Sequence, residues 1–241
     1  MFPLLNRNVP HVEGKIISYL EPKDLAASML VSKEWCQRVK PFLCEWYAYI
    51  QRRNGDVPLQ MAAVHGYYHL VAFFLQNVKY GLNEICSHTG KTALMEAALK
   101  GNDRIAKMLL EIKDIDVNMV SDQVQYVIPH STLVQISHRC NALELAASNG
   151  HAGIVKLLVD RGDTDVNATC SPFGHTALME AVINMQASAV EELLKHPDID
   201  VNMVDDNGHT ALSRAKALSA WPTTLKERQK IIAMLEERGA K

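Results

Sequence analysis

Long apolar runs are missing from this sequence, and so is an excess of charge of either sign. No stretch approaches the roughly 18 apolar residues that a membrane-spanning helix needs. The 25 lysine and arginine residues nearly balance the 27 aspartate and glutamate residues, which leaves a net charge of -2. Binding through a nucleic-acid phosphate backbone requires a concentrated basic face. We therefore expect neither a membrane-spanning protein nor nucleic-acid binding.

Targeting and lipidation signals are also lacking. The first residues, Met1 to Arg7, form too short an apolar run and become polar too soon for a signal peptide. The last residues, Glu236 to Lys241, contain no cysteine that prenylation would require. The sequence therefore gives no reason to expect a lipid anchor.

Motifs for disulfides, metals and phosphates are missing as well. The five cysteines are odd in number and include no Cys-x-x-Cys pair, which argues against a disulfide framework or a structural zinc site. A reducing compartment is the natural interpretation. The ten histidines contain no His-Glu-x-x-His pattern, and no glycine-rich phosphate loop occurs, so neither a metal nor a cofactor is expected. The cysteines are Cys36, Cys44, Cys86, Cys140 and Cys170.

Three glutamates resemble the paired carboxylates of acid–base catalysis. They are Glu96, Glu144 and Glu180. Glu96 and Glu180 stand in identical Ala-Leu-Met-Glu-Ala contexts, whereas Glu144 is displaced by one position, so the three need not converge. A Cys140 nucleophile with a distant histidine has no local motif to support it. We expect this protein not to be an enzyme.

A leucine recurs at the same place in five related stretches, at spacings of 35, 49, 35 and 34 residues. A period near 33 with a Thr-x-Leu-x-x-Ala core is typical of a helical repeat array. The stretches resemble ankyrin repeats, which implies an all-α solenoid of about five repeats over residues 53–241. The leucines are Leu59, Leu94, Leu143, Leu178 and Leu212. The expected repeats are 53–87, 88–122, 137–171, 172–205 and 206–241.

The second repeat shows the physical parts of the unit best. Thr92 is suited to cap the first helix, alanines allow close packing, and Gly101 ends that helix. The unit closes with Asp116-Val117-Asn118, where the asparagine tolerates turn geometry and its side chain can satisfy backbone groups. Related Asp-Val-Asn triplets recur at residues 165–167 and 200–202, which supports the division into units.

The N-terminal segment does not share the repeat period and predicts three short helices. Apolar residues fall at helical spacing from Val12 to Leu20, and Pro22 ends that helix. Asp24 and Ser32 are suited to cap a second and a third helix. Three helices of this length bury little apolar surface by themselves, so a partner or the neighbouring repeats must cover them.

The stretch from Ile16 to Leu25 contains Ser-Tyr-Leu-Glu-Pro-Lys-Asp-Leu and is followed by Val31-Ser-Lys-Glu-Trp35. These residues resemble an F-box over residues 1–52, although the usual Leu-Pro at its start is absent. The resemblance implies binding to a Skp-type adaptor, which connects F-box proteins to a cullin scaffold and to ubiquitin transfer. The residues that it assigns to the adaptor contact are Ile16, Leu20, Pro22, Leu25, Leu30, Val31 and Trp35. The alternative is a helical cap that shields the first repeat.

The spacing of 49 residues marks an insert between the second and third repeats, at residues 123–136. Two β-rich runs flank Pro129-His130-Ser131, which predicts a β-hairpin that extends from the loop tips. Insertions in repeat arrays map to loops on one face, often the binding face. We expect the hairpin, with Tyr126, to contact the substrate; the alternative is a surface excursion without a role.

The resemblance to ankyrin repeats implies a protein partner held by the loop tips and first helices. The candidate substrate-binding residues at these positions are His88, Lys91, Tyr126, His138, Phe173, His175, Asn207 and His209. Loop tips are also ordinary solvated turns, and only a few interface residues carry most of the binding energy.

The combination predicts a non-catalytic substrate receptor of a cullin-based SCF-type ubiquitin ligase, with a substrate that the sequence does not identify. An F-box followed by ankyrin repeats is similar to effectors that intracellular bacteria, Legionella among them, deliver into host cells. The expected location is the cytoplasm or nucleus of a eukaryotic cell. The alternative is an ankyrin scaffold that binds one protein without any link to ubiquitin.

Overall fold

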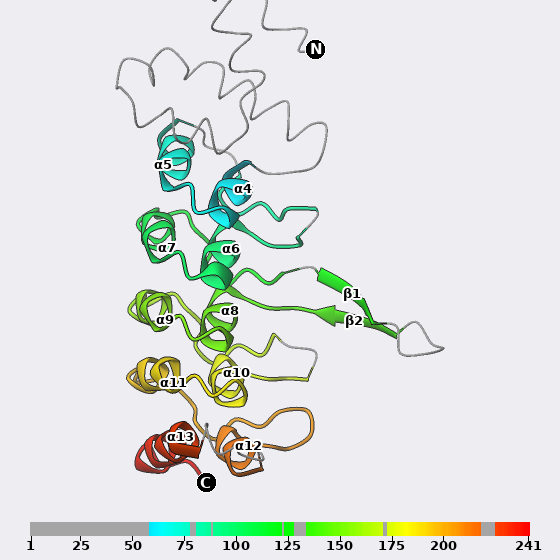
Figure 1. Cartoon of the computed structure of the whole chain (residues 1–241), viewed down its shortest axis with the longest axis vertical. Coiled ribbons are helices and arrows are strands. Elements are labelled where there is room, and N and C mark those ends of the chain that lie inside the picture. The colour runs from blue at the N-terminus through cyan, green and yellow to red at the C-terminus, as the bar shows by residue number, and fades with distance from the viewer. Residues whose placement is uncertain are drawn as a thin grey trace, which may run out of the picture.

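A computed structural model describes residues 58–77, 81–87, 89–121, 123–127, 134–170, 173–217 and 225–241. Elements carry the labels of Figure 1, which begin at α4. The predicted three-helix segment, residues 1–52, lies outside the described residues, so its F-box fold stays a prediction.

The helices stack in two parallel columns, one helix of each repeat in each column (Figure 1). The first column holds α4 (Pro58–Val64), α6 (Ala93–Lys100), α8 (Ala142–Ser148), α10 (Ala177–Ile183) and α12 (Ala211–Ala217). The second column holds α5 (Tyr68–Asn77), α7 (Asp103–Leu110), α9 (Ala152–Val159), α11 (Ala187–Leu194) and α13 (Leu225–Glu237). Among the described residues, no helix has the length and apolar character to cross a bilayer. The predicted helical solenoid is confirmed.

Local capping explains why the first helices begin where they do. The side chains of Thr92, Asn141 and Thr176 each accept a hydrogen bond from the backbone N–H three residues later. Such a cap satisfies one of the N–H groups that a helix start leaves without an intrahelical partner. Gly101 ends α6 with a φ of 70°, a left-handed conformation that glycine adopts without strain. The capping roles predicted for Thr92 and Gly101 are confirmed.

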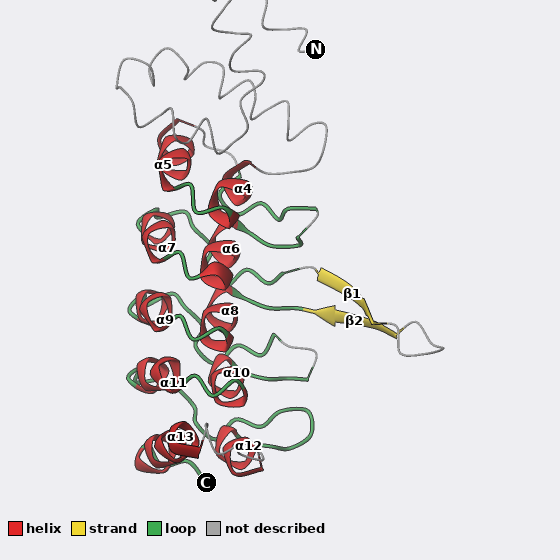
Figure 2. Cartoon of the chain, viewed as in Figure 1, coloured by secondary structure: helices red, strands yellow, loops and turns green. Residues whose placement is uncertain are grey.

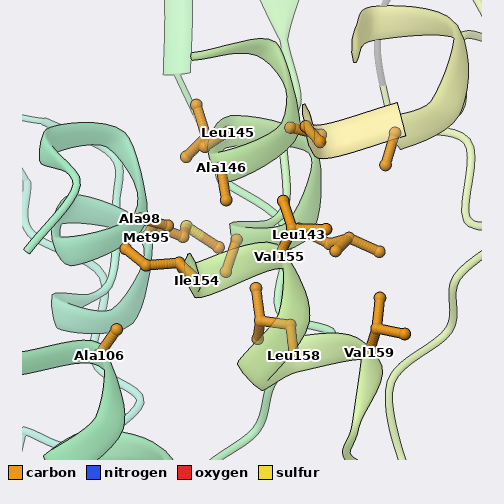
Figure 3. Close-up of a cluster of buried hydrophobic side chains, with 14 of the residues drawn as sticks. Met95, Ala98, Ala106, Leu143, Leu145, Ala146, Ile154, Val155, Leu158 and Val159 are labelled. Carbon is orange, nitrogen blue, oxygen red and sulfur yellow. The ribbon is translucent and has the colours of Figure 1, made fainter. Parts of the chain in front are cut away.

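The core runs between the two columns and continues from repeat to repeat. Helix α8 packs against α6 and α10, and α9 packs against α7 and α11. Figure 3 shows side chains of α6, α7, α8 and α9 meeting in this layer, among them Leu143, Ile154 and Leu158. Fully buried alanines such as Ala98 and Ala146 let the helix backbones approach closely. Each repeat therefore buries its apolar surface against its neighbours, as a solenoid must.

Asparagine side chains connect consecutive repeats. Asn118 donates from Nδ2 to the carbonyl of Asp163 at 2.6 Å and accepts from the N–H of Asp165 at 2.8 Å. Asn167 makes the equivalent pair of bonds to the next repeat. Asn83 does the same from the first repeat, although that repeat lacks the Asp-Val-Asn triplet. The turn-stabilising role predicted for these asparagines is thus a bond between repeats.

Two strands interrupt the series between the second and third repeats. Strand β1 (Gln123–Val127) pairs antiparallel with β2 (Val134–His138), in a register that places Gln125 opposite Ile136. Figure 2 shows the pair projecting beyond the other loops of the array. The second strand runs two residues past the predicted insert, whose end was expected at residue 136. The connection over residues 128–133 lies outside the described residues, so the Pro-His-Ser turn stays a prediction.

Candidate functional site

The loops that precede the first helices project to one side of the molecule, together with β1 and β2 (Figure 2). We call the loops before α6, α8, α10 and α12, with the adjoining side of those helices, the loop face. Glycines that adopt positive φ, such as Gly90 and Gly174, allow these loops to turn. The second-column helices cover the opposite side, so the loop face is formed by the second to fifth repeats.

Exposed apolar side chains mark the loop face near the fourth and fifth repeats. Phe173 is 49% exposed and Val204 is 55% exposed, which is unusual for large apolar side chains in this array. The carbonyl of Phe173 accepts a hydrogen bond from the N–H of Asp206 at 3.0 Å, so the two loops are joined. An exposed aromatic side chain on a rigid loop is suited to anchor a protein partner.

His175 lies where the sequence does not expect it. The sequence suggests a side chain at an exposed loop tip, but the structure buries His175 to 7% exposure. Its Nδ1 lies 2.8 Å from Oε1 of Glu180, because helix α10 places that carboxylate directly beneath the loop. The ring of Phe173 lies 5.6 Å from the imidazole. His175 therefore supports the loop, and a direct contact with a partner stays a prediction.

The remaining predicted contact residues are distributed along the loop face. Lys91 is half-buried, and its Nζ donates to the carbonyl of Thr89 at 3.2 Å. Asn207 and His209 are exposed in the loop before α12. The backbones of Tyr126 and His138 lie in β1 and β2, paired with Gln135 and Gln123. Residue 88 lies outside the described residues. The loop face thus brings the described candidates to one side without gathering them into one cluster.

A buried aspartate that the sequence analysis did not select organises the loop before α12. The side chain of Asp205 is fully buried and accepts hydrogen bonds from the N–H groups of Asn207 at 2.8 Å and His209 at 3.0 Å. Its Oδ2 also accepts from Arg214 Nε at 2.8 Å. Burial alone would raise the pKa of Asp205, but the hydrogen bonds from His209, Arg214 and Asn207 together hold it well below the usual range.

Acidic and thiol groups converge at the base of the loop face between the third and fourth repeats. Burial, and then the charge of Glu180, raise the pKa of Glu144 to about 8. Burial raises the pKa of Cys140 to about 12, with a further increase from Glu144. Asn141 donates from Nδ2 to Sγ of Cys170 at 3.2 Å. Glu144 and Glu180, which the sequence analysis did not expect to converge, therefore interact.

Thiols with raised pKa values are poor nucleophiles at neutral pH. Within the described part of the chain, no group of three or more histidine, cysteine or carboxylate side chains is placed to hold a metal ion. His65 and His69 have the spacing of a helical metal-binding pair, but α4 ends at Val64 and α5 begins at Tyr68, so no single helix carries both.

Comparison with known proteins agrees with the observed repeats. The family of ankyrin repeats matches in three copies, over residues 27–121 and 143–220. The chain belongs to the ankyrin-repeat family. The crystal structure of the ankyrin repeat protein EF0377 superimposes with a TM-score of 0.62 at 25% sequence identity, covering 76% of this chain and 81% of that one. Ankyrin repeats imply protein–protein interaction.

Two of the curated relatives are latrotoxins. Alpha-latrotoxin-Lt1a of Latrodectus tredecimguttatus is 31% identical over 127 residues, and alpha-latrotoxin-Lh1a of Latrodectus hasselti is 30% identical over the same length. Each match covers 52% of this chain but only 8% of the toxin. This chain therefore corresponds to a small part of each toxin. The family match also begins at residue 27, before the boundary that the sequence analysis places at residue 53.

Glu144 makes the stability of the ankyrin array depend on pH. A folded-state pKa near 8, above the ordinary value of 4.5, means that the folded chain holds its proton longer than the unfolded chain. Stability should therefore decline as pH rises from about 4.5 and level off above about 8. Glu144→Gln should remove much of this decline, and the gain at pH 8 amounts to at most a few kcal/mol at about 1.4 kcal/mol per pKa unit.

The measurement is urea unfolding of both proteins across this pH range. Glu180, Cys140 and Cys170 are the titratable groups coupled to Glu144, and the same series on Glu96→Gln serves as a control. Parallel pH profiles for Glu144→Gln and the unmutated chain would contradict the prediction.

Proposed function

We propose that this ankyrin protein is the substrate receptor of a cullin-based SCF-type ubiquitin ligase. The loop face holds the protein to be modified, and residues 1–52 bind a Skp-type adaptor. Ubiquitin transfer itself belongs to the partner proteins. The contribution of this chain is positional, because holding a substrate beside the ubiquitin carrier raises the local concentration of its lysines.

The observation that carries the substrate-binding half is the loop face itself. The loops before α10 and α12 are joined by a backbone hydrogen bond and present Phe173 and Val204 to solvent. Strands β1 and β2 lengthen this face beyond the other loops. An aromatic anchor on a rigid loop beside an extended edge suits the recognition of a folded protein or an extended segment. We infer that both regions contact the substrate.

The adaptor-binding half is supported by the pattern Pro22-Lys-Asp24-Leu25 and by Val31 and Trp35, which resembles the adaptor contact of F-box proteins. An F-box works only where Skp-type adaptors exist, so the place of action is the cytoplasm or nucleus of a eukaryotic cell. The similarity to F-box/ankyrin effectors suggests delivery into that cell by an intracellular bacterium.

Capture of a purified Skp-type adaptor by the full chain tests the proposal. We expect a stable complex with the unmutated chain, and at least about a tenfold loss of affinity for the double variant Pro22→Ala with Leu25→Ala, because hot-spot residues each contribute about 1–2 kcal/mol or more. Phe173→Ala, which changes the loop face alone, should bind the adaptor as tightly as the unmutated chain. Failure of the unmutated chain to bind, or equal binding by the double variant, would refute the ubiquitin-ligase role.

A second candidate is an ankyrin scaffold that binds one protein without any link to ubiquitin. The family match favours it, because the match begins at residue 27 and so includes part of the segment that the adaptor contact would use. A scaffold of this kind binds no adaptor. It also behaves as a single soluble species when purified alone, whereas an unaccompanied F-box exposes apolar surface and tends to aggregate.

A further inference from the structure

Two carboxylates on neighbouring first helices have no lysine or arginine as an ion-pair partner among the described residues. Helices α8 and α10 pack against each other and carry Glu144 and Glu180. Glu144 is only 4% exposed, and its Oε2 is buried without a hydrogen-bond partner. Most buried polar atoms in native proteins are hydrogen-bonded, and an unpaired one is costly. The fold itself therefore provides no hydrogen-bond donor for Oε2 of Glu144.

Further hydrogen-bond acceptors and negative charge surround Glu144. Glu180 raises the pKa of Glu144 through its charge, and the side chain of Glu144 acts in the same way on Cys140 and Cys170. Within the described residues, no lysine or arginine forms an ion pair with either carboxylate. Oε1 of Glu180 lies 2.8 Å from Nδ1 of His175, and its Oε2 accepts a hydrogen bond from Nδ2 of Asn184 at 3.3 Å. Lys91, which acts on Cys140, donates to a backbone carbonyl. The cluster has the composition of a cation site.

The cluster reaches solvent through Glu180, whereas Oε2 of Glu144 is itself buried. Glu180 keeps 20% of its side chain exposed, and Cys140 is half-buried. Phe173 lies at the edge of this cluster. Its ring lies 5.6 Å from the imidazole of His175, which in turn contacts the carboxylate of Glu180. An aromatic ring beside carboxylates favours a side chain with an apolar stem and a cationic end.

We propose that Glu144 and Glu180 together receive a lysine or arginine side chain of the bound protein. The stem of that side chain lies against Phe173, and its N–H groups donate to Glu180 and to the unpaired oxygen of Glu144. A cation offsets the repulsion between the two carboxylates and keeps Glu144 ionised, in contrast to the free protein. This inference rests on the proposed role of the loop face in holding a protein, and it requires no adaptor.

Selection of displayed random short peptides on the full chain tests the inference. One double variant carries both Glu144→Gln and Glu180→Gln. Glu96→Gln is the matched control, because Glu96 stands in the same Ala-Leu-Met-Glu-Ala context as Glu180. Glutamine at position 144 can still accept the backbone hydrogen bond from Asn141, so helix α8 keeps its cap. Selected peptides are then resynthesised with citrulline in place of arginine or norleucine in place of lysine.

We expect selected peptides to share a lysine or arginine at one position, and the two replacements identify which of them the site prefers. Neutralising that residue should weaken binding about tenfold or more to the unmutated chain and to Glu96→Gln, but little to the double variant, as in a double-mutant cycle. Peptides without a shared basic residue, no enriched peptide on a chain with intact helical circular dichroism, or an equal loss with the double variant would overturn the inference. Adaptor capture is measured separately, so failure of either proposal leaves the other standing.

Discussion

Leu158→Ala is expected to lower the free energy of unfolding by about 2–5 kcal/mol. Leu158 is fully buried in α9, in the layer where this helix packs against α7 and α11 (Figure 3). Truncation removes apolar surface from the core and leaves a cavity, and the small alanines nearby have little freedom to fill it. Because each repeat is stabilised mainly by its neighbours, the loss also weakens both interfaces of the third repeat.

Urea unfolding followed by helical circular dichroism measures this effect. Lys156→Ala on the same helix is the matched control, because Lys156 is exposed and its truncation should change stability by about 0.5 kcal/mol or less. A Leu158→Ala protein that unfolds at the same urea concentration as the control would contradict the packing described for α9.

The repeat fold could be predicted from the sequence because its determinants are local. Thr92 caps α6 through a bond three residues along the chain, and Gly101 ends the same helix with its own backbone conformation. The leucine period then sets how these units stack. Helix caps and helix ends depend on residues that are close in the sequence. Because the unit is repeated, the same capping pattern recurs several times in one chain.

The candidate site was harder to predict because its contacts join different repeats. Glu144 and Glu180 interact across α8 and α10 although they occupy different positions in their repeats. His175 was placed at a solvated tip, yet a carboxylate of the following helix draws it inward. Asp205 looks like an ordinary loop residue in the sequence. Its importance comes from Arg214 and two backbone N–H groups, which no periodicity reveals.

Asp205→Ala should destabilise the protein by about 3 kcal/mol, since removing one partner of a buried ion pair leaves the other charge uncompensated. The charge of Arg214 would remain partly buried, at 27% side-chain exposure, and the N–H groups of Asn207 and His209 would lose their acceptor. Asp205→Asn is the matched control. Its amide oxygen can still accept from the backbone but carries no charge, so we expect an intermediate loss.

The same carboxylate predicts the acid sensitivity of the last repeats. The pKa of Asp205 is lower in the folded chain than its ordinary value of 3.8, so the unfolded chain takes up a proton first as pH falls. Its contribution is thus fully present above about pH 4 and is lost on further acidification. Urea unfolding at pH 7 and below pH 4 should show a gap between the unmutated chain and Asp205→Ala that narrows in acid. A gap that stays constant with pH would mean that the packing of the loop, rather than the charge on Asp205, holds the last two repeats together.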